Sequence, residues 1–216
     1  MTIQYREITC QEEQLLLTNQ RAVYWPRQKA LILSDLHLGK AAHFRKFGIP
    51  ISNKVFKDDL KKLEELIGFF QVTRLIIVGD LFHAEANTEV MDFQGWISKN
   101  PGLSIELIKG NHDQLTDRIY NLLGVKIYKD SLELSGFCFV HERPQSFTDK
   151  FTITGHTHPG VVLKGRGKQR LRLPCYQLSN SGLVLPAFSK FTGLDTRKTK
   201  ENPICYAITD TSVFEV

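Results

Sequence analysis

The sequence predicts a single-domain α/β protein in which two packed β-sheets are flanked by helices. Short β-rich apolar runs alternate with amphipathic helical stripes through the first half of the chain. After Val125 the helical periodicity ends and strand patterns follow one another. The 216 residues contain no repeat, low-complexity tract or Pro/Gly/Ser-rich linker, so we expect one domain over residues 1–216.

The first half is predicted to run β-α-β-α-β. Three apolar runs predict buried strands that each end at a cluster of Asp, Gly, Asn or His, and they cover residues 30–33, 75–78 and 105–108. Residues 55–70 carry apolar side chains at steps of three and four, which is typical of an amphipathic helix. Ser52 or Asn53 is suited to cap this helix.

A shorter helix and then a β-dominated half follow. Val90, Phe93 and Ile97 share one helical face after the candidate caps Asn87 and Thr88. Strand patterns then occupy residues 131–140, 151–154, 161–173 and 205–216. Chain order is expected to bring the strand ends of both halves to one rim.

The composition is that of an ordinary globular protein, with 42% apolar and 24% charged residues. No apolar run approaches the roughly 20 residues that span a bilayer, and no secretory signal opens the chain, so we expect a cytoplasmic protein. The four cysteines lie far apart without a CxxC pair, which argues against a disulfide framework or a zinc knuckle. The net charge of +5 favours polyanionic partners, although a modest lysine excess is also compatible with simple solubility.

Two polar clusters directly follow the first two predicted strands. Asp35 and His37 stand two residues apart, and in an extended chain they point the same way, so they can hold one cation together. In the second cluster Gly79 allows close approach and leaves Asp80 free to bridge two metals, with His83 as a supporting residue that holds a ligand or a water. Taken singly, each aspartate is better explained as a turn or capping residue.

A third cluster, Gly110-Asn111-His112-Asp113, follows the third strand. Asn111 offers a neutral carbonyl ligand, His112 a titratable donor, and Asp113 a carboxylate able to orient an imidazole. Gly-Asn is also good turn chemistry, so a simple turn is the alternative.

Imidazoles gather again in the second half. His141 ends an apolar run, and His156 and His158 form a second pair spaced by two residues. Imidazole ligands suit borderline divalent metals. Six of the seven histidines lie in or beside these clusters, and each cluster follows a strand, so together they predict a metal site that no single cluster would establish.

This ordered set of motifs, from Asp35 to His158, resembles the calcineurin-like metallophosphoesterase superfamily. The resemblance implies a four-layer α/β/β/α sandwich of the metallophosphoesterase type, with two metals at the sheet rim. It places Asp35, His37, Asp80 and His158 on one metal, and Asp80, Asn111, His141 and His156 on the other. Asp80 would then bridge the two.

The segment after the first motif narrows the resemblance to one group within the superfamily. Residues 35–40, Phe44-Arg45 and residues 48–50 look like the bacterial DNA-ligase-associated phosphoesterases assigned to the DNA damage response. That resemblance implies DNA as substrate and a DNA ligase or helicase as partner. It does not fix the oligomeric state.

The expected chemistry is hydrolysis by a two-metal site. Two cations about 3.5 to 4 Å apart activate a bridging hydroxide and clamp phosphate oxygens. His112, oriented by Asp113, is the candidate for protonating the leaving oxygen. The mixed N and O ligands suit Mn, Fe, Zn, Ni or Co, and the family resemblance favours Mn.

Basic residues near the first motif are candidate phosphate contacts, namely Lys40, His43 and Arg45. A second basic stretch alternates through a hairpin-like segment and comprises Lys164, Arg166, Lys168, Arg170 and Arg172. It is suited to phosphate contacts, and equally to a charged edge strand that resists aggregation.

Three functions are therefore compared. The leading one is a phosphodiesterase or nuclease that acts on DNA in repair. The second is a pyrophosphatase or phosphodiesterase on a small nucleotide conjugate, similar to the UDP-diacylglucosamine hydrolases, but the roughly 27 residues between Asp113 and His141 leave little room for an apolar lid. The third is a non-catalytic scaffold of the same fold, against which the retention of every ligand type argues.

Overall fold

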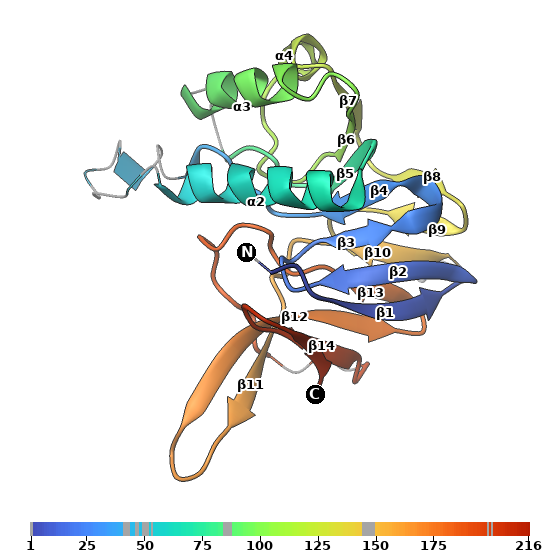
Figure 1. The fold of residues 1–216 in the computed structure, drawn as a ribbon, viewed down its shortest axis with the longest axis vertical. Helices are drawn as coiled ribbons and strands as arrows, with labels where there is room; N and C mark the ends of the chain where they lie inside the picture. Colours follow the sequence, from blue (N-terminus) through green and yellow to red (C-terminus); the bar gives the residue numbers. More distant parts are fainter. Residues whose placement is uncertain are drawn as a thin grey trace.

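The protein folds as two β-sheets packed face to face, with helices on the outside of one of them (Figure 1). The structure is a computed structural model, and it describes residues 2–40, 44–45, 48, 52, 54–83, 88–143, 150–197, 199 and 201–216. Within these ranges no helix is long and apolar enough to cross a membrane.

The first sheet has seven strands in sequence order. Its first four strands pair antiparallel, and the last four pair parallel, as expected where helices connect successive strands. The strands are β1 (Tyr5–Cys10), β2 (Glu13–Thr18), β3 (Val23–Trp25), β4 (Ala30–Leu33), β5 (Arg74–Val78), β6 (Ser104–Ile108) and β7 (Val125–Tyr128), with a short 3-10 helix η1 (Pro26–Gln28) before β4.

All described α-helices cover one face of this sheet (Figure 1). They are α2 (Lys54–Phe70), α3 (Thr88–Ser98) and α4 (Asp117–Leu122). The apolar stripe of α2 packs on the strands because its period of 3.6 residues puts Phe56, Leu63 and Leu66 on one side. The backbone N–H of Lys54 donates to Ser52 Oγ at 3.1 Å, which satisfies one of the free amides at the helix start.

The second sheet has eight strands in a mixed arrangement. β9, β10 and β13 are parallel neighbours at its centre, and the outer pairs are antiparallel. The strands are β8 (Leu132–Leu134), β9 (Phe137–Phe139), β10 (Phe151–Thr154), β11 (Gly160–Lys164), β12 (Arg170–Ser179), β13 (Gly182–Val184), β14 (Ile204–Ile208) and β15 (Val213–Glu215).

A second apolar core fills the space between the sheets. Alternation along β4 and β5 sends Ile32 and Ile76 into this core, whereas Leu31 and Leu75 face the helices. Trp25 is fully buried here, its ring 5.0 Å from that of Phe137. Both faces of the parallel strands are therefore covered, which explains why their sequences are continuously apolar.

The hairpin of β11 and β12 leaves the body of the protein. Among the described strands β11 pairs only with β12, and the ribbon projects outward at the lower left of Figure 1. Its outer residues, 164–172, are all exposed.

Most of the fold prediction is confirmed. The α/β class with two large sheets is as expected, and the helix predicted at 55–70 is α2. In the described residues the helices cover only the seven-stranded sheet, so the second outer helical layer of a four-layer sandwich is not among them. The cap Asn53 and the cap Asn87 lie outside the described residues.

Three details differ from the sequence prediction. Residues 131–140 form a hairpin rather than one strand, because Ser135 and Gly136 adopt positive φ and turn the chain between β8 and β9. Residues 205–216 likewise divide into β14 and β15. Strands β1 to β3, strands β7 and β13 and helix α4 were not predicted; α4 has only six residues, too few for a periodic signal.

Candidate metal centre

The loops after β4 and β5 run side by side at the rim of the first sheet. The parallel pairing of these strands continues beyond their ends, since the backbone N–H of His37 donates to Asp80 O at 2.8 Å and that of Leu38 donates to Leu81 O at 2.8 Å. His83 N then donates back to Leu38 O at 2.7 Å. This ladder places the first two sequence motifs beside each other.

Five of the predicted metal ligands adopt left-handed backbone conformations, with φ of 55° at Asp35, 48° at His37, 54° at Asp80, 65° at His156 and 49° at His158. Each such conformation is costly for a residue other than glycine, and such strain gathers at functional sites. The extended geometry predicted for Asp35 and His37 is therefore wrong. Their side chains converge because the backbone turns at each ligand.

Two motif glycines are required by close packing against the predicted ligands. A Cβ on Gly79 would overlap the imidazole of His141, and Gly79 also has a φ of 81°. A Cβ on Gly110 would overlap the carboxylate and backbone of Asp80. The sequence prediction that Gly79 permits close approach is thus explained by a contact between the two sheets.

The predicted ligands from both halves of the chain form two adjoining groups. One contains Asp35, His37 and His158, and the other contains Asp80, His141 and His156. The ligand atoms within each group lie within 4.8 Å of one another. Parallel strands in both sheets end at this rim, which is why residues more than 100 positions apart meet there.

Asp80 lies between the two groups. Its Oδ2 is 3.7 Å from His37 Nε2 and 3.5 Å from His141 Nε2. Asn111 lies on the second side, with its Oδ1 3.3 Å from His141 Nε2. The geometry matches the bridging position that the family resemblance implies for Asp80.

The buried polar atoms fit divalent cations. Asp35 Oδ1 and both ring nitrogens of His37 are buried without a hydrogen-bond partner among the described residues. Buried polar atoms are nearly always satisfied, so this set points to a bound cation. The donors are imidazole nitrogens and carboxylate oxygens, which suit borderline and hard divalent metals.

Electrostatics favour ionised aspartate at the centre. Burial opposes ionisation of Asp80, but hydrogen bonds and charge interactions with His141, His112 and His37 together outweigh it and lower the pKa of Asp80 to about 2. Burial lowers the pKa of His37 to about 3, so this imidazole is neutral and its lone pair is available. At His141 burial favours the neutral form, but the hydrogen bonds with Asp80 and the Val78 carbonyl and the negative charges of Asp80 and Asp35 together raise the pKa to about 9. Metal binding at His141 would therefore release a proton.

Ser34 supports the site and was missed in the sequence. Its hydroxyl donates to Asp35 Oδ2 at 2.5 Å, and the backbone N–H of His156 donates to the same oxygen at 3.1 Å. One carboxylate oxygen is thereby fixed while Oδ1 stays available, with His158 Nε2 3.1 Å away. The only signal in the sequence is that Ser34 adjoins the ligand.

Asp113 is placed differently from the prediction that it orients His112. Its carboxylate accepts hydrogen bonds from the backbone N–H groups of Asp80 at 2.8 Å, Gly110 at 2.9 Å and Phe82 at 3.1 Å. Burial raises its pKa to about 6. Both oxygens thus bind the loops that carry Asp80 and Asn111.

His112 and His83 lie beside the first group of ligands. The His112 ring centre is 5.2 Å from that of His37 and 4.7 Å from that of His83. The backbone N–H of His112 donates to Asp80 Oδ1 at 2.9 Å. His112 is only half-buried, so its imidazole can reach a substrate bound at the rim.

The predicted phosphate contacts differ in their surroundings. Lys40 is half-buried near the site, and burial lowers its pKa against the attraction of Asp35 and Asp80. Arg45 Nη2 lies 3.6 Å from the buried Glu89 carboxylate, whose other oxygen accepts the Gly39 N–H at 2.6 Å. Arg45 therefore takes part in packing this loop. His43 lies outside the described residues.

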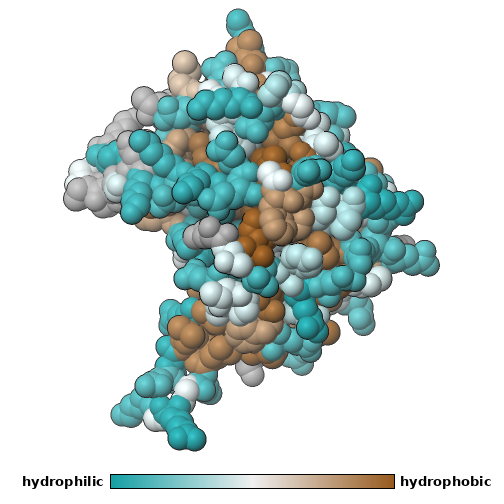
Figure 2. Space-filling model, in the orientation of Figure 1, coloured by the Kyte–Doolittle hydropathy of each residue, from teal (hydrophilic) through white to brown (hydrophobic). Residues whose placement is uncertain are grey.

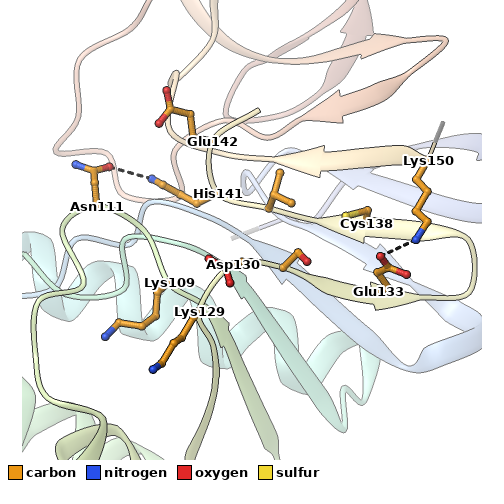
Figure 3. Close-up of a pocket in the computed structure, with 11 residues that line it drawn as sticks. Lys109, Asn111, Lys129, Asp130, Glu133, Cys138, His141, Glu142 and Lys150 are labelled. Atoms are coloured by element: carbon orange, nitrogen blue, oxygen red, sulfur yellow. Dashed lines mark hydrogen bonds and ion pairs between the residues drawn. The ribbon is translucent and has the colours of Figure 1, made fainter. Parts of the chain in front are cut away.

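A cleft of about 640 Å³ opens beside Asn111 and His141 (Figure 3). Its charged lining residues are Lys109, Lys129, Lys150, Asp130, Glu133 and Glu142. Lys150 Nζ lies 2.6 Å from Glu133 Oε1, at the far end of the cleft in Figure 3. Three basic and three acidic side chains line the cleft, so its charges balance.

Comparison with known proteins supports one family. No family model matches the sequence, and no curated protein matches it. Among solved structures, the Pseudomonas putida nuclease MPE has 30% sequence identity and a TM-score of 0.84, covering 99% of this chain and 100% of its own. The phosphoesterase YfcE from E. coli has 17% identity and a TM-score of 0.45, covering 87% of this chain and 97% of its own. On the first of these relatives, together with the ordered ligand motifs, the chain belongs to the calcineurin-like metallophosphoesterases.

Proposed function

We propose that this protein is a dinuclear-metal phosphodiesterase that cleaves DNA, with a role in DNA repair. The observation that carries the proposal is the pair of ligand groups adjoining at Asp80. Its similarity over nearly the whole chain to a protein described as a nuclease supports a nucleic-acid substrate. A repair role and a DNA ligase or helicase partner extend the proposal from the family resemblance.

We assign a separate role in metal binding or proton transfer to each side chain of the site. Asp35, His37 and His158 would hold one metal, Asn111, His141 and His156 the other, and Asp80 both. When bound, the metal pair activates water as nucleophile and neutralises phosphate charge. We assign to His112 the protonation of the leaving oxygen, because its half-buried imidazole lies at the rim beside the ring of the ligand His37.

Asp113 and His83 support these residues. Asp113 fixes the loops that present Asp80 and Asn111. His83 packs its ring against those of His37 and His112, at ring-centre distances of 5.6 and 4.7 Å. Among the described residues, Lys40 is our candidate for contact with a non-bridging phosphate oxygen.

We propose Mn as the working metal, with Zn, Fe, Ni and Co as alternatives. The ligand atoms are imidazole nitrogens, carboxylate oxygens and one amide oxygen, with no thiolate. This ligand set does not select one first-row metal. At most sites of this kind the affinity for divalent metals rises along the series from Mn to Cu, whichever metal the protein uses. Metal identity is therefore part of the test.

The test is one panel of metals and substrates. Purified protein is loaded with Mn, Zn or Mg and assayed on bis(p-nitrophenyl) phosphate, a phosphomonoester, single- and double-stranded DNA, and a nucleotide diphosphate conjugate. We expect Mn-dependent cleavage of the diester and of DNA, with Asp80→Ala inactive. Asp92→Ala, an exposed aspartate on α3, is the matched control and should behave as wild type.

Cleavage of the nucleotide conjugate alone would overturn the DNA proposal and favour a small-molecule pyrophosphatase. Full activity of metal-replete Asp80→Ala protein would overturn the metal centre itself. Metal binding without hydrolysis of any phosphoester would favour a scaffold of the same fold.

A further inference from the structure

The hairpin of β11 and β12 is an unusual feature of the molecule outside the metal centre. We define the arm as residues 160–174. It begins two residues after His158 and extends from the body of the protein (Figure 1). Hydrophilic residues cover its outer part (Figure 2).

The arm carries the whole net charge of the protein. The chain has 28 Lys and Arg residues against 23 Asp and Glu, and the arm holds five of the basic residues and no acid. The rest of the chain therefore has 23 residues of each sign. None of the five basic side chains makes an ion pair with a described residue. A neutral body with one cationic projection is a strongly polarised molecule.

The strand register sorts the arm into two faces. Lys164 is paired with Arg170, and Arg172 with Val162. Directly paired residues in an antiparallel ladder share a face, so the three basic side chains lie together. The opposite face carries the apolar residues Val161, Leu163, Leu171 and Leu173. The turn between the strands adds Arg166 and Lys168.

The base of the arm is fixed beside the metal ligands. The backbone N–H of Asp195 donates to His158 O at 2.9 Å, and that of Gly160 donates to Asp195 O at 2.8 Å. A strand rises about 3.3 Å per residue, so the five residues of β11 carry the basic face on the order of 15 Å from the ligand. A small phosphodiester at the metal centre would not reach it, whereas a polynucleotide would.

We propose that the arm is a nucleic-acid-binding ribbon that holds phosphates of the substrate strand away from the cleaved bond. This inference rests on the proposed function, since it assigns a polymer to the same site. The cleft beside Asn111 is a weaker candidate for this role, because its charges balance. Phosphate contacts of this kind add affinity without sequence preference.

The test compares two triple variants with the same loss of charge. The arm variant carries Lys164→Gln, Arg170→Gln and Arg172→Gln. The control carries Gln at Lys54, Lys57 and Lys99, which are exposed on or next to the helices. Binding of a fluorescent single-stranded oligonucleotide is measured by anisotropy in EDTA over a range of salt concentrations, and unfolding midpoints confirm that both variants are folded.

The arm variant should bind roughly tenfold to 100-fold more weakly than the control near 0.1 M salt. Its slope of log affinity against log salt should fall by about 2, since each lost contact to a single strand contributes about 0.7. Equal affinity and slope in the two variants would overturn the proposal and leave the arm as a charged strand that only resists aggregation.

Two further measurements separate the alternatives. Hydrolysis of bis(p-nitrophenyl) phosphate by the wild type tests the metal centre alone, so its failure would count against the proposed function and not against the arm. A Leu171→Asn variant tests the apolar face. If this variant loses binding while the basic variant keeps it, or if wild-type protein binds anionic vesicles and no oligonucleotide, the proposal is wrong.

Discussion

His112 illustrates how a residue gains a role from its neighbours. It lies outside both ligand groups, yet its ring packs against His37 and its backbone N–H contacts the carboxylate of Asp80. Removing the imidazole would therefore remove the proposed proton donor while the ligands keep their places. This separates metal binding from catalysis.

We expect His112→Ala to retain its metals and to lose about 100-fold to 10,000-fold in DNA cleavage rate, the usual contribution of a general acid. Metal content by elemental analysis and single-turnover kinetics on the same preparation are the measurements. An exposed neighbour, Gln114→Ala, is the control. A His112→Ala protein that cleaves at the wild-type rate would remove this residue from the mechanism.

Substitution of Asp113 is expected to change metal affinity. Its carboxylate accepts hydrogen bonds from backbone N–H groups in the loops of Asp80 and Asn111. An asparagine at this position would place its NH2 group, a donor, against one of those N–H donors. We expect Asp113→Asn to weaken metal affinity by about 10-fold to 100-fold, the usual cost of losing support around a metal site. Calorimetric metal titration measures this. Wild-type affinity combined with a lost rate would instead restore the sequence prediction that Asp113 acts with His112.

At the scale of elements, helix α2 is tied to the metal centre by a buried charge. Lys62 donates to Phe188 O at 2.6 Å and lies 3.4 Å from Asp59 Oδ1. Phe188 N in turn donates to Ser34 O at 2.8 Å, next to the ligand Asp35. Burial lowers the pKa of Lys62 to about 8, so the charge is retained at neutral pH because of these partners.

Breaking this pair should destabilise the whole fold. We expect Lys62→Met to lower the free energy of unfolding by about 3 kcal/mol, because it leaves Asp59 buried without its nearest cation. Lys61→Met is the matched control, since Lys61 is 76% exposed, and it should change stability by less than about 0.5 kcal/mol. Urea unfolding of both variants measures this difference in the free energy of unfolding. Equal midpoints would show that the buried pair contributes nothing net.

At the scale of the whole molecule, the metal centre joins the two sheets. Asp35, Asp80 and Asn111 extend from the first sheet, and His141, His156 and His158 from the second. Metal bound across this rim would stabilise the folded state, because the ligands are not assembled in the unfolded chain.

We therefore expect Mn at about 100 times its dissociation constant to add about 2.7 kcal/mol per site and to raise the unfolding midpoint by about 5 to 10 °C for each site filled. Thermal unfolding with and without a chelator measures this shift. The Asp80→Ala variant should show little metal-dependent shift of the unfolding midpoint, since Asp80 contacts both ligand groups. An identical shift in the variant would mean that the metal binds elsewhere.

Much of this protein follows from local sequence patterns. The stripe of α2 and the apolar runs of β4, β5 and β6 predicted their elements, because period and burial are local properties. The residue types of the site were also predicted, because Asp, Asn and His at strand ends carry metal chemistry. Short elements such as α4 were not predicted, since six residues are too few to show a helical period.

The sequence by itself determined which residues are able to bind metal and which strands deliver them. Only the tertiary structure decided how they converge: left-handed turns at Asp35 and His37 aim their side chains, and Asp113 supports the backbone of Asp80 rather than an imidazole. It also decided that the basic stretch leaves the body as an arm beside His158. These outcomes depend on contacts between residues far apart in the chain, and a local pattern does not encode such contacts.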